Sequence, residues 1–440
     1  MHLIWEVLIM SIQNPETPFG PREVPKPFFE NKWVQLIIAM IGMIMIANLQ
    51  YAWTLFVPEV VKGLNSTKAA VQMGFSLFIA FESWGQPIAG YFMDRYSPRA
   101  LLTVAALMIG IGWAGMGLVK SLGALYFLYS MAGVGAALIY SGSIASGVRW
   151  FEASKRGMAS GLVAAAFGSG AALFIPFIAI ILKKQGYNSA FVTTGVIQGI
   201  IALIAAQFMR FPAKPKTSSS STAKAQVSAS QRDFTTVEMF KTAHFWIIYL
   251  MFLFICTGGM IVTAQTKPFG TEAGIAASII VTAATINTIA NGAGRIIWGM
   301  ISDKLGRYQT MFVAFTINAI AMALVPFIGH NAFMFVFIFA LIMFTWGELY
   351  SLFPAVNADI FGTTYAATNY GFIYSAKGLS GIVGGFVAAL VAQMSGWTPV
   401  FLTGAVMSLL AGLGALLLRS IPKPVPSGIK SGSSGFSSQA

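Results

Sequence analysis

The chain has 440 residues, of which 56% are hydrophobic and only 9% charged, with a mean hydropathy of +0.74. A soluble domain, with roughly 25% charged residues, cannot bury that much apolar surface, so the composition indicates an integral membrane protein. The net charge of +13 does not indicate a nucleic-acid partner, because Lys and Arg fall mainly in alternate loops. Cys256 is the only cysteine and the histidines share no ligand spacing, so we expect no disulfide, no metal and no cofactor.

Apolar stretches recur along the chain, each about as long as the ~20 residues that cross a bilayer as a helix. They predict an all-α fold with twelve transmembrane helices, near residues 33–56, 70–92, 100–119, 122–148, 157–182, 190–210, 244–266, 276–300, 309–329, 332–357, 367–392 and 397–419.

A stretch rich in Ser, Lys, Thr and Pro separates the sixth helix from the seventh and predicts a cytoplasmic linker. Basic residues concentrate in the loops on the linker's side, so both termini are predicted to be cytoplasmic in a cell (inner) membrane. Membrane lipid is then the expected surroundings, and a monomer the expected functional unit. The predicted segments are an N-terminal segment 1–32, six-helix bundles 33–210 and 243–420, the linker 211–242 and a disordered cytoplasmic tail 421–440.

The two predicted bundles are sequence repeats. The Gly-x-x-x-Asp-basic pattern of residues 90–95 returns at residues 299–304, and Gly161 has its counterpart in Gly371. Both copies follow the same helix of their half, which predicts two halves of the same topology, pseudo-symmetric about an axis along the membrane normal.

Four longer segments carry a family resemblance, at residues 48–56, 149–161, 291–308 and 345–378. Together with the repeated loop, they resemble the oxalate/formate antiporter family of the major facilitator superfamily, over nearly all of residues 30–420. The resemblance implies the major facilitator fold. It also implies that the loop charges lock one half against the other as a gate, which assigns that role to Asp94, Arg95, Asp303 and Lys304.

Charged residues within the predicted spans are costly and are therefore candidates for function. Four lie deep: Glu82, Arg295, Glu348 and Lys377. Arg295 and Lys377 lie at similar depths on the eighth and eleventh helices. They belong to the second half only, because the repeat aligns them with Gln86 and Phe167 of the first half. The asymmetry favours an anion site with its charge partners on one wall.

Polar and aromatic side chains accompany the two cations at helical spacing. Thr288 and Asn291 precede Arg295, and Tyr370 and Tyr374 precede Lys377. The family resemblance implies that aromatic residues cage a small planar carboxylate between the cations, which assigns the substrate site to Arg295, Lys377, Tyr140, Trp346, Tyr350, Gln50 and Tyr51, with Tyr374 beside them.

Glu82 and Glu348 leave three interpretations open, which are neutralisation of the cations, proton coupling and helix packing. Two unpaired cations ~8 Å apart would repel by about 2 kcal/mol at an effective dielectric near 20. The sequence therefore predicts that the carrier closes readily only with an anion bound, and so exchanges substrates, unless one of the acids already cancels that repulsion.

The leading function from sequence is secondary antiport of small carboxylates, with oxalate/formate exchange as the family's type reaction. The alternative is proton-coupled symport of a monocarboxylate such as lactate or formate. An enzyme is not expected, because the spans carry no nucleophile or metal constellation. The chain also lacks the phosphate-binding loop that would point to transport driven directly by ATP.

Overall fold

The computed structural model describes residues 28–95, 98–151, 156–212, 233–362 and 365–426, and these residues form helices and their connections. The first half contains η1 (Phe28–Glu30), α2 (Lys32–Tyr51), α3 (Trp53–Gly63), α4 (Lys68–Arg95), α5 (Pro98–Gly115), α6 (Leu122–Trp150), α7 (Arg156–Gly170), η3 (Ala171–Leu173) and α8 (Ile175–Phe208). A short α9 (Thr236–Phe240) precedes the second half. That half contains α10 (Ala243–Glu272), α11 (Ala277–Leu305), α12 (Arg307–Ile328), α13 (Ala332–Gly347), α14 (Leu349–Phe361), α15 (Ala366–Tyr374), α16 (Ala376–Gly381), the π-helical turn η4 (Ile382–Val387), α17 (Ala388–Ser395) and α18 (Trp397–Ser420).

Nine segments of the described residues are apolar and long enough to cross a membrane. One of them, Met158–Phe208, has 51 residues and is broken at Gly186 (φ 81°, ψ 175°), so it makes two crossings. The helices α4 and α11 fall outside this set because they carry more polar residues, yet their 28 and 29 residues span ~42 Å at 1.5 Å per residue. Within the described ranges the chain therefore crosses twelve times, as the apolar pattern predicts.

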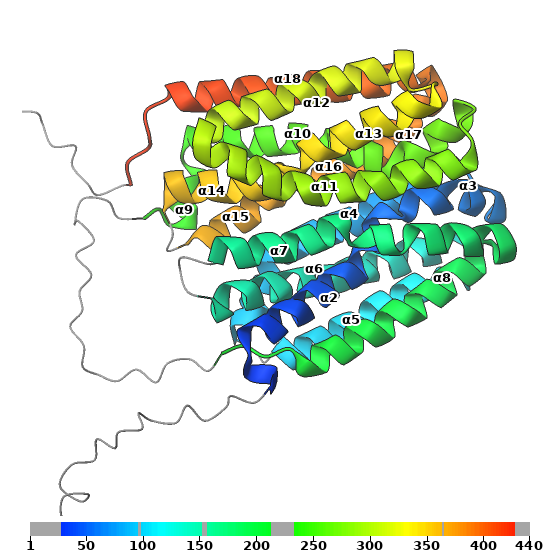
Figure 1. Ribbon diagram of the computed structural model, residues 1–440, viewed down its shortest axis with the longest axis horizontal. Coiled ribbons are helices and arrows are strands. Elements are labelled where there is room, and N and C mark those ends of the chain that lie inside the picture. The colour runs from blue at the N-terminus through cyan, green and yellow to red at the C-terminus, as the bar shows by residue number, and fades with distance from the viewer. Residues whose placement is uncertain (1–27, 96–97, 152–155, 213–232, 363–364, 427–440) are drawn as a thin grey trace, which may run out of the picture.

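The helices form two bundles that lie side by side (Figure 1). In the first, α4 packs on α6 and α5 on α8; in the second, α12 packs on α18 and α11 on α13. Across the boundary, α7 contacts α11 and α4 contacts α16. The helices that carry Glu82, Arg295 and Lys377 are therefore among those that meet between the halves.

Glycines allow these helices to meet closely. A Cβ atom on Gly292 of α11 would lie 2.8 Å from the Cβ of Ser169 on α7. On the other side, a Cβ on Gly381 of α16 would lie 2.4 Å from Ile79 of α4. Both distances are below normal van der Waals contact, so only glycine fits there. Arg295 and Lys377, close in sequence to these glycines, are thus held against the opposite half.

Hydrogen bonds join the halves at the end opposite α9 (Figure 1). The amide of Gln72 on α4 donates to the Ala264 carbonyl of α10 at 2.7 Å and to Gln265 Oε1 at 3.2 Å. Nearer the surface, the backbone N–H of Lys267 donates to Thr54 Oγ1 at 2.7 Å. Since each of these bonds links one half to the other, this end of the molecule is closed in the structure.

Three helices predicted to be continuous are interrupted at the level of the intramembrane charges. The chain leaves regular α-helix at Ala52 between α2 and α3, at Glu348 between α13 and α14, and at Ser375 between α15 and α16. Within α14, Pro354 also leaves the Tyr350 carbonyl without the usual backbone donor four residues later. Ala52, Glu348 and Ser375 all keep right-handed helical dihedral angles, so each interruption is local and the chain continues in the same span.

Candidate functional site: a buried cationic cage between the halves

Arg295 lies on α11 with 3% of its surface exposed, and it reaches across to the first half. Its Nη1 donates to the Ala164 carbonyl of α7 at 2.8 Å. Its Nη2 donates to Asn291 Oδ1, one turn earlier on the same helix, at 3.1 Å and to the Tyr51 hydroxyl of α2 at 3.4 Å. These contacts fix the guanidinium plane, which is the geometry needed for a two-pronged bond to a carboxylate.

Lys377 lies on α16 and is fully buried, and it also contacts the first half. Its Nζ donates to Glu82 Oε2 of α4 at 2.8 Å and to the Tyr374 hydroxyl at 3.0 Å. The Tyr374 hydroxyl in turn donates to Glu82 Oε1 at 3.2 Å. The lysine, the tyrosine and the glutamate thus form a closed hydrogen-bonded triangle that joins the two halves.

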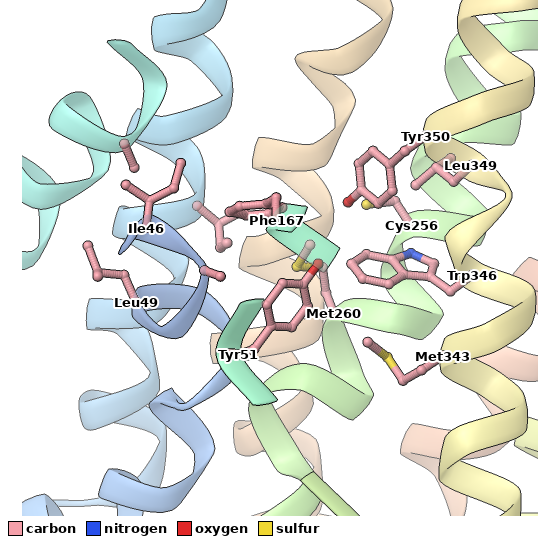
Figure 2. Close-up of a cluster of buried hydrophobic side chains, with 14 of the residues drawn as sticks. Ile46, Leu49, Tyr51, Phe167, Cys256, Met260, Met343, Trp346, Leu349 and Tyr350 are labelled. Atoms are coloured by element: carbon pink, nitrogen blue, oxygen red, sulfur yellow. The ribbon is translucent and has the colours of Figure 1, made fainter. Parts of the chain in front are cut away.

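The two cations share the same aromatic rings. The Arg295 guanidinium carbon lies 4.1 Å from the centre of the Tyr350 ring and 5.7 Å from that of Phe167. Lys377 Nζ lies 6.0 Å and 5.5 Å from the same two centres. Phe167 belongs to the first half and Tyr350 to the second (both labelled in Figure 2), so each cation lies near a ring of each half. The prediction that the two cations share one level of the molecule is confirmed.

Further aromatic rings enclose the cations. The Tyr51 ring centre lies 5.5 Å from Phe167 and 6.5 Å from Trp346, and Trp346 packs edge-on against Tyr350 at 5.3 Å (Figure 2). Tyr140 and Tyr374 close the cage at the linker-facing side, 5.9 Å apart. The structure therefore joins the predicted aromatic residues, with Phe167, through one series of ring contacts, namely Tyr51, Trp346, Tyr350, Tyr374 and Tyr140.

Several buried polar atoms of the predicted substrate-site residues have no hydrogen-bond partner among the described residues. They are both amide atoms of Gln50, Nε1 of Trp346 and the hydroxyl of Tyr350. A buried donor or acceptor without a partner costs about 1–3 kcal/mol, so such atoms call for an explanation. Tyr350 lies against the Arg295 guanidinium, and Trp346 packs against Tyr350. The unpaired N–H and O–H groups of these two residues are therefore suited to hydrogen-bond a small polar ligand.

A small cavity extends from Tyr51 toward the closed end. Its volume is about 10 Å³, room for roughly one water molecule, and its polar lining comes from both halves. Thr54 belongs to α3, Thr266 to α10, and Asn287 and Thr288 to α11. A carboxylate cannot pass through a space of this size, so this cavity is not a route for a substrate toward that end.

The two predicted acids have different surroundings. The repulsion expected between two unpaired cations is reduced, because Glu82 pairs directly with Lys377, which is the alternative that the sequence left open for the acids. Glu348 is fully buried at the junction of α13 and α14, and neither of its oxygens has a hydrogen-bond partner in the described residues. Glu348 therefore neutralises neither cation by contact, and proton coupling or packing by this residue stays a prediction.

The predicted gate is described only in the second half. Asp303 pairs with Arg307 at 3.0 Å, and Arg307 also approaches Asp359 of α14 at 3.7 Å, so these contacts stay within one bundle. Lys304 is exposed. The side chains of Asp94 and Arg95 lie outside the described residues, and a lock between the halves stays a prediction.

Sequence reasoning missed Phe167 as a site residue, although it touches both cations. The repeat held the signal, because Phe167 is the first-half counterpart of Lys377, and positions related by a pseudo-twofold axis near the centre face each other across it. The Ala164 carbonyl was also missed. A backbone carbonyl has no residue type, so no sequence pattern could have shown it.

These features define a multi-pass membrane carrier with a buried cationic site between two repeated bundles. The family model described as Major Facilitator Superfamily matches residues 37–275 and 259–438. The chain is 39% identical, over 91% of its length and 94% of the relative's, to the oxalate:formate antiporter of Oxalobacter formigenes. It belongs to the oxalate/formate antiporter family of the major facilitator superfamily.

More distant relatives share the transporter class. An uncharacterized MFS-type transporter of Escherichia coli (strain K12), YhjX, is 25% identical over 81% of this chain and 88% of its own length. The probable sulfoacetate transporter SauU of Cupriavidus necator is 22% identical over 82% of this chain and 86% of its own. The similarity in each case covers both bundles.

Proposed function

We propose that this protein exchanges small carboxylates across the membrane, with oxalate and formate as the leading pair, and that it is a carrier and not an enzyme. The observation that carries the proposal is the placement of Arg295 and Lys377 on the same two aromatic rings, buried between the halves. The relative from Oxalobacter formigenes, named as an oxalate:formate antiporter, supports the choice of substrate.

The geometry divides the work between the two cations. The fixed Arg295 guanidinium can hold one carboxylate through two parallel hydrogen bonds, and the Lys377 ammonium supplies a second point charge for a dicarboxylate. Aromatic faces on both sides suit a flat anion, and the free donors of Trp346 and Tyr350 can hydrogen-bond to its oxygens. Because the anion would contact both halves, its binding energy can stabilise the closed form through which the carrier switches sides.

Rocking of two rigid bundles, 33–210 and 243–420, about this site is the proposed transport movement. We further propose that the protein acts as a monomer and that the 211–242 linker and both termini are cytoplasmic. An Ala225→Cys variant tests the orientation, since the native Cys256 is buried and reacts little. Reaction of the introduced thiol with a membrane-impermeant reagent in intact cells would contradict the cytoplasmic assignment.

Binding to the purified protein tests the proposed substrates. We expect oxalate and formate at a hundred times their dissociation constants to stabilise the protein by about 2.7 kcal/mol, seen as a raised melting temperature. Oxamide and formamide are matched controls, because they keep the shape of the ligands without their charge. Equal stabilisation by the amides, or none by either carboxylate, would contradict the proposal.

Proton-coupled uptake of a monocarboxylate is the second candidate. One observation favours it, namely that Glu82 already neutralises Lys377, which leaves Arg295 as the cage cation with no carboxylate partner among the described side chains. An inward proton gradient imposed on liposomes without internal substrate separates the two functions. Symport predicts accumulation of lactate or formate under that gradient, whereas antiport predicts none.

A further inference from the structure

The contacts of Lys377 raise a question of charge. A dicarboxylate at Arg295 needs a second cation, yet the Lys377 ammonium is held by Glu82 Oε2 at 2.8 Å, with both side chains at most 1% exposed. The Ser83 hydroxyl lies 3.2 Å from the same oxygen but only 2.7 Å from the Ile79 carbonyl oxygen, which is the better acceptor of its single proton. The carboxylate thus has one strong donor on each oxygen, Tyr374 on Oε1 and Lys377 on Oε2, and is held in place by both.

The carboxylate of Glu82 and a substrate carboxylate would compete for the same ammonium group. Lys377 Nζ faces the cage, because it lies near the Phe167 and Tyr350 rings that also contact Arg295. The same ammonium group contacts Glu82. With Glu82 ionised, the three groups Arg295, Lys377 and Glu82 carry a net charge of +1, which matches a monocarboxylate. A dicarboxylate matches the site only when the negative charge of Glu82 is displaced or neutralised.

We infer that Glu82 is a specificity-determining residue that occupies the place of the second carboxylate on Lys377. A monocarboxylate binds at Arg295 and leaves the Glu82–Lys377 pair intact. A dicarboxylate takes over Lys377 and separates the pair. Since Glu82 lies on α4 and Lys377 on α16, separation also removes a direct bond between the halves, so the two substrate classes leave different contacts across the boundary. This inference rests on the proposed carboxylate transport.

The Glu82→Gln variant tests the inference, because it removes the charge and keeps the shape. We expect the ratio of oxalate affinity to formate affinity, measured by calorimetry on the purified full chain, to rise at least tenfold. The reason is that a dianion is repelled by the Glu82 carboxylate twice as strongly as a monoanion at the same distance. Glu59→Gln is the matched control, since it removes an acid from α3 that pairs with Lys267 at 3.7 Å, and should leave the ratio within twofold of wild type.

A ratio unchanged by Glu82→Gln, in a variant that still binds both anions, would overturn the inference and leave the proposed function standing. Failure of the wild-type protein to bind either anion would instead overturn the proposed function, and the inference with it.

The Glu82→Gln variant also leaves Lys377 without its buried partner and can fail to fold. Structures of the wild-type protein with each anion then decide. In the oxalate complex, we expect the distance between Glu82 Oε2 and Lys377 Nζ to exceed ~4 Å, the limit of an ion pair. In the formate complex, we expect the ion pair to persist. An intact pair in both complexes would overturn the inference.

Discussion

Replacement of Arg295 by alanine should lower carboxylate exchange at least 100-fold, which corresponds to about 2.7 kcal/mol. The guanidinium donates hydrogen bonds to the Ala164 carbonyl, Asn291 and the Tyr51 hydroxyl. Alanine removes this donor from all three groups, and it also removes the cation that would bind the substrate carboxylate. Truncation of one partner in a buried charged hydrogen bond typically costs about 2–5 kcal/mol. Initial exchange rates in liposomes, normalised to the amount of reconstituted protein, provide the measurement.

Two further variants give this prediction its controls. Arg295→Lys keeps the charge but not the planar fork, so we expect a loss of about tenfold, between wild type and Arg295→Ala. Arg419→Ala removes a positive charge from an exposed position in the last turn of α18, and exchange should stay near the wild-type rate. An Arg295→Ala rate within threefold of wild type would show that substrate does not bind at this guanidinium.

Replacement of Gly294 by alanine should destabilise the protein by about 3 kcal/mol or prevent its folding. The added Cβ would lie 2.1 Å from the Phe344 carbonyl oxygen of α13 and 3.0 Å from its carbonyl carbon. These are backbone atoms and cannot swing aside, and overpacking of a tight core costs about 1–3 kcal/mol or more. The carbonyl also accepts a hydrogen bond from Trp298 Nε1 at 3.1 Å, so its displacement disturbs a second contact.

Gly299→Ala in the same helix is the matched control, because the nearest atom to its added Cβ is Ser351 Cβ at 3.9 Å. Alanine there should be neutral or slightly stabilising, since it favours helix over glycine by up to about 1 kcal/mol. The measurement is the melting temperature in detergent together with the yield of monodisperse protein. If the Gly294→Ala and Gly299→Ala variants have the same melting temperature, then α11 and α13 can separate more easily than the structure indicates.

The fold was largely predictable because membrane helices follow from local properties. Stretches of about 20 apolar residues must be helical in a bilayer, since no water is present to satisfy the backbone. The two helices hardest to identify by hydropathy, α4 and α11, are those that carry Glu82 and Arg295. Polar residues that lower the hydropathy of a span are the same ones that make its site, so in this chain a weak hydrophobic signal points to function.

The sequence was sufficient to predict which residues form the candidate site, but not which of them contact each other. Intramembrane charges and the internal repeat identified both cations, and helical spacing linked Asn291 to Arg295. The Glu82–Lys377 contact joins residues 295 positions apart. It depends on how α4 packs against α16, which no local pattern contains. For the same reason the sequence could not separate a site with two free cations from one in which a carboxylate already neutralises one of them.

Uptake of labelled oxalate into liposomes that contain the wild-type protein and are loaded with formate tests the central claim most directly. The account predicts rapid uptake that exceeds, at least tenfold, the uptake into protein-free liposomes and into liposomes loaded with chloride. It also predicts that Arg295→Ala abolishes the difference. Uptake equal to that of protein-free liposomes, or equal with internal formate and internal chloride, would contradict carboxylate exchange through the Arg295–Lys377 site.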